Sequence, residues 1–154
     1  MDILELCKFL VKAKINTYTS GREGTILTDG SKELTFEEGE FVYRDKYHGF
    51  NPFIGGEVVF CKGKCIWGMN YYGYIIPSEG ISQKEVYAFL REALKKVGKE
   101  KPFRGPKKYE ENSFQYVNSV EGNLGMFNGI EKILYKGKEV YRLLYHGGFT
   151  KGEI

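Results

Sequence analysis

The sequence predicts an α+β fold in which a helix-strand-strand-strand unit occurs twice. The two units are expected to form a pseudo-twofold antiparallel sheet, or a partly closed barrel, with two helices. Three observations predict this fold: a hairpin sequence that occurs twice, an amphipathic helical segment before each copy, and runs of β-branched and aromatic residues. With 154 residues the chain suits a single domain over 1–154, with repeat one at about 2–76 and repeat two at about 82–149.

The repeat is clearest in two segments that align without a gap. Residues 53–73 match residues 127–147 at an offset of 74, and eight of the 21 pairs are identical. Similarity at a fixed offset indicates a repeated structural unit. The identical pairs are Phe53/Phe127, Gly55/Gly129, Glu57/Glu131, Lys62/Lys136, Gly63/Gly137, Lys64/Lys138, Tyr71/Tyr145 and Gly73/Gly147.

A helix is expected at the start of each copy. Asp2 and Ser82 each stand three residues before a glutamate, as in a capping box, and apolar residues at helical spacing follow. The helices match at an offset of 80 and the next strands at 73, so copy one has seven extra residues between them. These residues indicate an added hairpin within 25–36 that turns at Asp29-Gly30.

Three strands follow in each copy, and the last two are joined by the tight turn Lys-Gly-Lys, which predicts antiparallel pairing. A three-residue turn ending at Gly63 would place Glu57 on the face of Trp67, whereas a two-residue turn would move it to the other face. We favour the first, because two-residue turns usually begin with Asn, Asp or Gly. The predicted strands are 41–47, 57–61, 65–75, 114–120, 131–135 and 139–147.

One face of the predicted sheet combines carboxylates with aromatic rings. Aromatic residues make up 16% of the chain. A carboxylate among such rings in a concave site favours a cationic or amphipathic ligand. Alternatively, each glutamate caps a backbone group or pairs with a lysine, and the rings belong to a β-rich core. The candidate ligand-binding residues, at the junction of the copies, are Glu57, Glu131, Trp67, Tyr71, Tyr141 and Tyr145.

The opposite face differs between the copies, which makes it either a secondary polar site or a solvated sheet surface. Its candidate residues are Asn70, Tyr72, Arg142 and His146. His146 with Tyr72 or a glutamate would suit a hydrolase or isomerase. No catalytic acid or nucleophile motif lies at an informative spacing, so we do not expect an enzyme.

Cofactor, metal and membrane motifs are not found in the sequence. Phosphate-loop and dinucleotide patterns are missing, and Cys61 and Cys65 do not complete a four-ligand zinc site, so we expect neither cofactor nor metal. No segment has the length and apolarity of a membrane span. The N-terminal residues do not resemble a secretory signal, and three cysteines suit a reducing compartment, so we expect a cytoplasmic protein without a membrane partner.

Positive charge is concentrated in residues 91–108, which hold eight basic side chains, although the net charge is only +3. This segment gives an alternative function, a protein or nucleic-acid interaction module. A solvated helix end explains it as well, since basic residues complement the helix dipole there, so we do not expect nucleic acid as the main partner.

Four segments resemble the signatures of an uncharacterised prokaryotic domain-of-unknown-function family, found alone or after an XRE-type helix-turn-helix. The segments are Leu34–Gly39, Trp67–Gly73, Pro102–Pro106 and Tyr145–Gly148. The resemblance implies no site residue, but it implies that relatives serve as sensing halves of regulators. The repeated plan also resembles gyrase-inhibitor-type effector-binding domains, which hold cationic or amphipathic ligands. We therefore expect a stand-alone small-molecule (effector) binding module, for which a regulator is one candidate partner.

Overall fold

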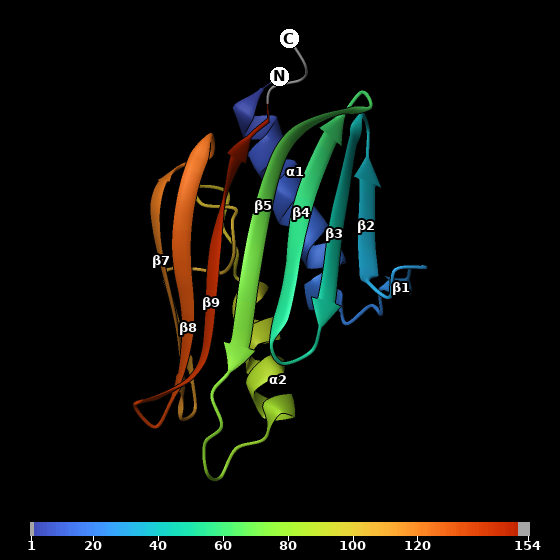
Figure 1. The fold of residues 1–154 in the computed structure, drawn as a ribbon. Helices are drawn as coiled ribbons and strands as arrows, with labels where there is room; N and C mark the ends of the chain where they lie inside the picture. The colour runs from blue at the N-terminus through green and yellow to red at the C-terminus, as the bar shows by residue number, and fades with distance from the viewer. Residues whose placement is uncertain (1, 151–154) are drawn as a thin grey trace.

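The computed structural model describes residues 2–150 and has the predicted α+β architecture. Figure 1 shows both helices behind a single antiparallel sheet. The helices are α1 (Ile3–Asn16) and α2 (Gln83–Leu94), with the short 3-10 helix η1 (Tyr18–Ser20). The strands are β1 (Thr25–Ile26), β2 (Lys32–Glu38), β3 (Phe41–Gly49), β4 (Phe53–Cys61), β5 (Lys64–Ile75), β6 (Lys108–Glu111), β7 (Phe114–Asn123), β8 (Met126–Tyr135) and β9 (Lys138–Phe149).

The nine strands form an open sheet rather than a partly closed barrel. Their order is β1-β2-β3-β4-β5-β9-β8-β7-β6, so β1 and β6 are the edges and β5 and β9 meet in the middle. The halves of the chain are joined through this central pair, in which Tyr71 lies opposite Tyr145. The barrel alternative fails because β1 and β6 do not pair with each other.

The helices begin where the capping residues predicted. The Asp2 side chain accepts a hydrogen bond from the Leu4 amide at 2.9 Å, and Ser82 forms a full capping box with Glu85. Each helix buries one apolar stripe against the sheet. The added hairpin is also present as β1 and β2, with Gly30 in the left-handed conformation at its turn.

The turn between β4 and β5 differs from the prediction. Cys61 pairs with Lys64, so the turn has two residues, and Lys62 and Gly63 both have positive φ. The register then shifts at a bulge between Val59 and Phe60, which returns Glu57 to the face of Trp67. The expected face is therefore reached by a two-residue turn plus a bulge.

The second half has the same local geometry at the same places. The turn at Lys136 and Gly137 again has two residues with positive φ, and the bulge lies between Ile133 and Leu134, 74 residues after its counterpart. In both halves the bulge keeps the buried glutamate in phase with the core strand beside it.

The core lies between the helices and the face of the sheet that they cover. Large side chains from both halves fill it, and Trp67, Tyr43, Tyr116 and Tyr141 are at most 1% exposed. Neither helix within residues 2–150 has the length and apolar character needed to cross a bilayer.

Candidate functional site

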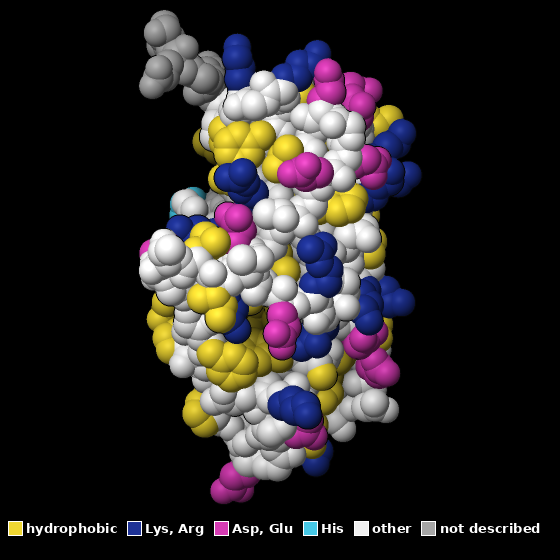
Figure 2. Space-filling view, turned by 90° about the vertical axis from the view of Figure 1, so that its right-hand side faces the viewer, with side chains coloured by type: hydrophobic (Ala, Val, Ile, Leu, Met, Phe, Trp, Pro, Cys, Tyr) yellow, Lys and Arg dark blue, Asp and Glu magenta, His cyan; other side chains and the backbone are white. Residues whose placement is uncertain are grey.

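A groove of about 620 Å³ opens over the strands of the first half, between α2, residues 18–24 and the strands β2 to β5. Figure 2 shows this side, with hydrophobic side chains gathered in a hollow and charged side chains around it. Its size is that of a typical small-molecule site. The residues that line the groove include Tyr18, Arg22, Glu23, Lys32, Asp45, Tyr47, Phe50, Phe53, Tyr71, Lys84, Tyr87, Arg91 and Arg104.

Aromatic rings form the walls of the groove. Tyr87 of α2 packs edge-on against Phe50 at 5.1 Å between ring centroids, and Phe53 lies 6.2 Å from Tyr87 and 6.0 Å from Tyr71. The Tyr87 hydroxyl donates to the Phe50 backbone oxygen, which ties the loop after β3 to α2. Phe50 remains 65% exposed, so its ring offers free apolar surface to a bound molecule.

Asp45 provides the buried acidic group of the groove. It lies on the covered face of β3, is 6% exposed, and accepts a hydrogen bond from the Tyr71 hydroxyl at 2.5 Å through Oδ1. Among residues 2–150, no donor to the other carboxylate oxygen, Oδ2, is found, whereas every side-chain nitrogen or oxygen that is fully buried has a hydrogen-bond partner. This means that Oδ2 is not fully buried. Oδ2 is therefore the acceptor that Asp45 leaves open to the space it lines.

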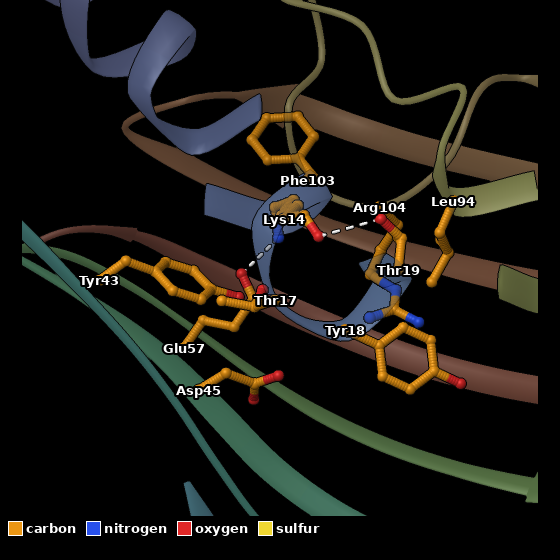
Figure 3. Close-up of a pocket in the computed structure, with 10 residues that line it drawn as sticks. All are labelled: Lys14, Thr17, Tyr18, Thr19, Tyr43, Asp45, Glu57, Leu94, Phe103 and Arg104. Atoms are coloured by element: carbon orange, nitrogen blue, oxygen red, sulfur yellow. Dashed lines mark hydrogen bonds and ion pairs between the residues drawn. The ribbon is translucent and has the colours of Figure 1, made fainter. Parts of the chain in front are cut away.

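A smaller cavity adjoins this floor and shares Tyr18, Asp45 and Arg104 with the groove. Figure 3 shows Lys14 of α1 pointing to Glu57, with Asp45 beside them. Lys14 and Glu57 form an ion pair in which their side chains are only 9% and 3% exposed. Glu57 lies directly across from Asp45 in the register of β3 and β4, so a second carboxylate, which Lys14 does not bind, lies beside this ion pair.

The electrostatics of the cluster follow from burial and this crowding. Burial and the charge of Glu57 raise the pKa of Asp45 to about 7, against the hydrogen bond from Tyr71 and the charges of Lys14 and Arg104. Burial lowers the pKa of Lys14, although Glu57 opposes this shift. Burial also raises the pKa of Tyr71 well above its ordinary value, so this hydroxyl stays protonated and donates.

The second half contains a closed version of the same cluster. Arg104 donates to both carboxylate oxygens of Glu131, at 3.1 and 2.8 Å, and the hydroxyls of Tyr116 and Tyr141 donate to Glu131 at 2.5 and 2.9 Å. Burial lowers the pKa of Arg104, but the charge and hydrogen bonds of Glu131 together with Tyr141 and Tyr116 outweigh it, so the pKa lies well above the ordinary value. Glu131 is fully buried and fully bonded.

Asn118 occupies the place in this closed cluster that Asp45 has in the open one. It accepts from the Tyr145 hydroxyl at 2.8 Å, as Asp45 accepts from Tyr71, and its amide donates to the Gly105 oxygen at 3.1 Å. The loop that carries Arg104 and Gly105 covers this side. A neutral amide therefore replaces the carboxylate where the site is sealed.

The six predicted ligand-binding residues all lie on one buried face of the sheet, but they do not line one common pocket. Tyr71 lines the groove and Glu57 lines the small cavity. Trp67 donates to the Leu124 oxygen at 3.1 Å and stacks on Phe127, while Tyr141 and Tyr145 bind Glu131 and Asn118. The groove is lined by strands and loops of the first half and by α2 and Arg104 of the second half, and Tyr71 is the one predicted residue among those that line it.

Sequence reasoning missed Asp45, Lys14 and Arg104. Asp45 is in phase with the core residues Phe41 and Tyr43 on its strand, and Lys14 continues the apolar stripe of α1 after Leu10. A charged residue at a core position was therefore a usable signal. Arg104 lies in a loop, where no periodicity marks its burial.

The secondary candidate residues lie on the uncovered face of the sheet. Asn70 and Asn128 flank His146 on the neighbouring strands, and no side-chain hydrogen bond of His146 to a described residue occurs. Arg142 pairs with Glu139 at 2.6 Å. An apolar row crosses this face through Ile54, Tyr72, Leu144 and Ile130, which are paired in register on adjacent strands.

The basic segment 91–108 does not form one uniform surface. Arg104 is bound to Glu131, and Lys95 and Lys108 pair with Glu92 and Glu110. Among residues 2–150, no group of three or more His, Cys, Asp or Glu side chains could hold a metal ion. Chemically, the first-half cluster can bind a donor or a cation and can exchange a proton near neutral pH.

Comparison with known proteins gives one match. A family model described as a domain of unknown function (DUF5680) matches residues 45–150. Searches of the curated proteins and of the solved structures gave no significant match.

Proposed function

Because the chain belongs to the DUF5680 family, whose function is unknown, we propose its function from the groove: it is a non-enzymatic binding module for a small amphipathic ligand. The observation that carries this proposal is a groove of about 620 Å³ with aromatic walls and one buried carboxylate at its floor. Concave apolar sites with few polar groups are the usual places where proteins bind small molecules.

Two features favour binding over chemistry. The open acceptor of Asp45 offers orientation to a ligand. The Tyr71 hydroxyl that is hydrogen-bonded beside it has a pKa raised well above its ordinary value by burial, so it stays protonated and is a poor nucleophile. Among residues 2–150, the fully buried side-chain nitrogens and oxygens all have hydrogen-bond partners, so they act as a fixed frame.

Glu57 and Glu131 belong to that frame in this proposal. Each glutamate pairs with a cation of the chain itself, Glu57 with Lys14 and Glu131 with Arg104. The free carboxylate that meets the ligand is Asp45, while Phe50 and Tyr87 provide the apolar contact.

A thermal-shift screen of amphipathic molecules tests the proposal. A ligand at 100 times its Kd stabilises the fold by about 2.7 kcal/mol. Phe50→Ala removes exposed ring surface in the groove and should weaken any hit by about tenfold. Ile54→Ala is the matched control, because Ile54 is 56% exposed on the opposite face of the sheet.

The expected outcome is a shift that falls in Phe50→Ala and persists in Ile54→Ala. Equal shifts in both variants, or no hit in a broad screen, would contradict the proposal.

We further propose that the two halves arose by duplication. The shared offset of 74 in sequence, the repeated bulges and turns, and the Tyr71–Tyr145 pair at the centre support it. Among family members, the two halves should keep resembling each other at this offset. Independent halves without that resemblance would speak against duplication.

We also propose a cytoplasmic setting for this binding module. Cys7, Cys61 and Cys65 are unpaired, which suits a cytoplasmic protein. The resemblance to sensing halves of XRE-type regulators and to gyrase-inhibitor-type domains is consistent with effector binding beside a regulator. The proposal itself depends on the groove alone.

A further inference from the structure

The floor of the groove carries one carboxylate more than its cations balance. Lys14 pairs with Glu57, whereas Asp45, directly across the strand pair, receives only the neutral hydroxyl of Tyr71. In the second half, Arg104 balances Glu131 and the neighbouring group is neutral Asn118. A single positive charge near Oδ2 of Asp45 would give the first half the same balance.

The mouth of the groove has the opposite excess. Its basic side chains form no ion pair with any residue in 2–150, and Glu23 is the only acid that lines the mouth beside them. Unpaired cations around an opening attract an anion. These basic residues are Arg22, Lys32, Lys84 and Arg91.

The two charged regions differ in depth. Asp45 is buried, whereas Lys32 and Lys84 are exposed and Arg91 is half-buried, with its guanidinium 6.0 Å from the centre of the Tyr18 ring. Aromatic side chains line the space along with them. A ligand that satisfies both regions needs a positive group inside, a negative group outside and an apolar body between them.

We propose that the groove binds an amphipathic zwitterion, whose protonated amine meets Asp45 and whose acid group meets the basic mouth. This inference rests on the proposed function and names its ligand class. The amine donates to Oδ2, the acid group pairs with Lys84 and Arg91, and the apolar body packs on Phe50 and Tyr87.

Matched synthetic probes test the inference by NMR titration. The short zwitterion is 4-(2-aminoethyl)benzoate, with 2-phenylethylamine and 4-ethylbenzoate as its single-charge analogues. The longer zwitterion is 4′-(aminomethyl)biphenyl-4-carboxylate, with 4-(aminomethyl)biphenyl and biphenyl-4-carboxylate as analogues. At least one zwitterion should bind about tenfold more tightly than either of its analogues, since each charge-assisted contact contributes that order of affinity.

Two variants assign the ends of the bound zwitterion. Asp45→Asn should remove its advantage over the acid analogue, while Asp29→Asn, at an exposed carboxylate outside the groove, should not. Lys84→Gln/Arg91→Gln should remove its advantage over the amine analogue. Lys95→Gln/Lys96→Gln removes the same charge from the end of α2 and should leave the advantage intact.

Failure of the inference can be told from failure of the proposed function. If an amine or an acid alone binds as tightly as the zwitterion, and Phe50→Ala weakens that binding, the groove is a ligand site but the inference is overturned. The inference is also overturned if neither zwitterion gives a saturable shift at about 10 mM, which would detect a Kd of about 1 mM. If the broad screen also gives no hit, the proposed function fails with it.

Discussion

The two buried clusters of this protein contain equivalent hydrogen bonds and ion pairs, but they differ in net charge and in exposure. In each, a tyrosine on a central strand donates to a side chain two strands away: Tyr71 to Asp45, and Tyr145 to Asn118. Beside them, Glu57 holds Lys14 and Glu131 holds Arg104. The second cluster is neutral and covered by a loop, whereas the first retains an unbalanced carboxylate beside a groove.

Burial of charge alone therefore does not mark a binding site. Glu131 is the more deeply buried glutamate, yet its four donors leave it no capacity for a ligand. Asp45 is set apart by an open acceptor and by the lack of a cation of its own. The following changes test this contrast.

Removing the cation of the closed cluster should have the largest effect. Arg104→Met leaves Glu131 buried without its counter-ion, which should lower the free energy of unfolding by about 3–5 kcal/mol. Arg142→Met is the control, because Arg142 and Glu139 form an ion pair whose side chains are 35% and 25% exposed, and its loss should be below about 1 kcal/mol. Denaturant unfolding that gives equal losses would mean that the closed cluster is not structural.

Replacing Asp45 by asparagine should remove a pH dependence of the free energy of unfolding. Folded Asp45 holds its proton up to a pKa of about 7, whereas the unfolded chain releases it near the ordinary 3.8. Its contribution to stability is thus present below that lower value and is lost as pH rises through about 7. Relative to wild type, Asp45→Asn should gain about 2–4 kcal/mol between pH 4 and 8.

The reciprocal variant completes this comparison. Asn118→Asp places a second carboxylate near Glu131 and should introduce a new decline of stability with rising pH. Thermal and denaturant unfolding across the pH range measures both variants. Profiles that run parallel to wild type would show that Asp45 does not titrate as an unbalanced group.

Glycines make room for the paired tyrosines and should matter in both halves. A Cβ on Gly129 would lie 2.2 Å from Cζ of Tyr145, and one on Gly55 would lie 2.5 Å from the Tyr71 hydroxyl. Each alanine variant should lower the free energy of unfolding by about 1–3 kcal/mol. Gly98→Ala, with nothing within 4 Å, should stay within about 0.5 kcal/mol. A tolerated Gly129→Ala would mean that the ring of Tyr145 can move.

The smallest effect is expected on the uncovered face of the sheet. His146 is exposed between Asn70 and Asn128, so His146→Ala should change stability by less than about 0.5 kcal/mol. It should also leave ligand shifts unchanged. A lost shift in this variant would move the site from the groove to this face.

Much of the fold was predictable because local rules agree with it. Capping residues gave the helix starts, and the repeated Lys-Gly-Lys turns gave the hairpins. The turn itself was mispredicted, since lysine is unusual at positive φ and the compensating bulge leaves no clear trace in sequence. The short edge strand β6 was missed for lack of a long alternating pattern.

The site was less predictable because its contacts join distant segments. The aromatic face and both glutamates were found from the repeat, but their partners were not. Lys14 comes from α1 and Arg104 from a loop, and only the folded chain brings them to the sheet. The replacement of Asp45 by Asn118 is visible at an offset of 73, yet its meaning depends on which half is covered.

Titration of the Asp45 carboxyl carbon by NMR, without ligand and with the better-binding zwitterion, measures directly whether Asp45 is the unbalanced group of the groove. We expect a pKa of about 7 in the free protein and a clear decrease when an amine binds beside it. A carboxyl that titrates at the ordinary value for aspartate in both states would contradict this expectation.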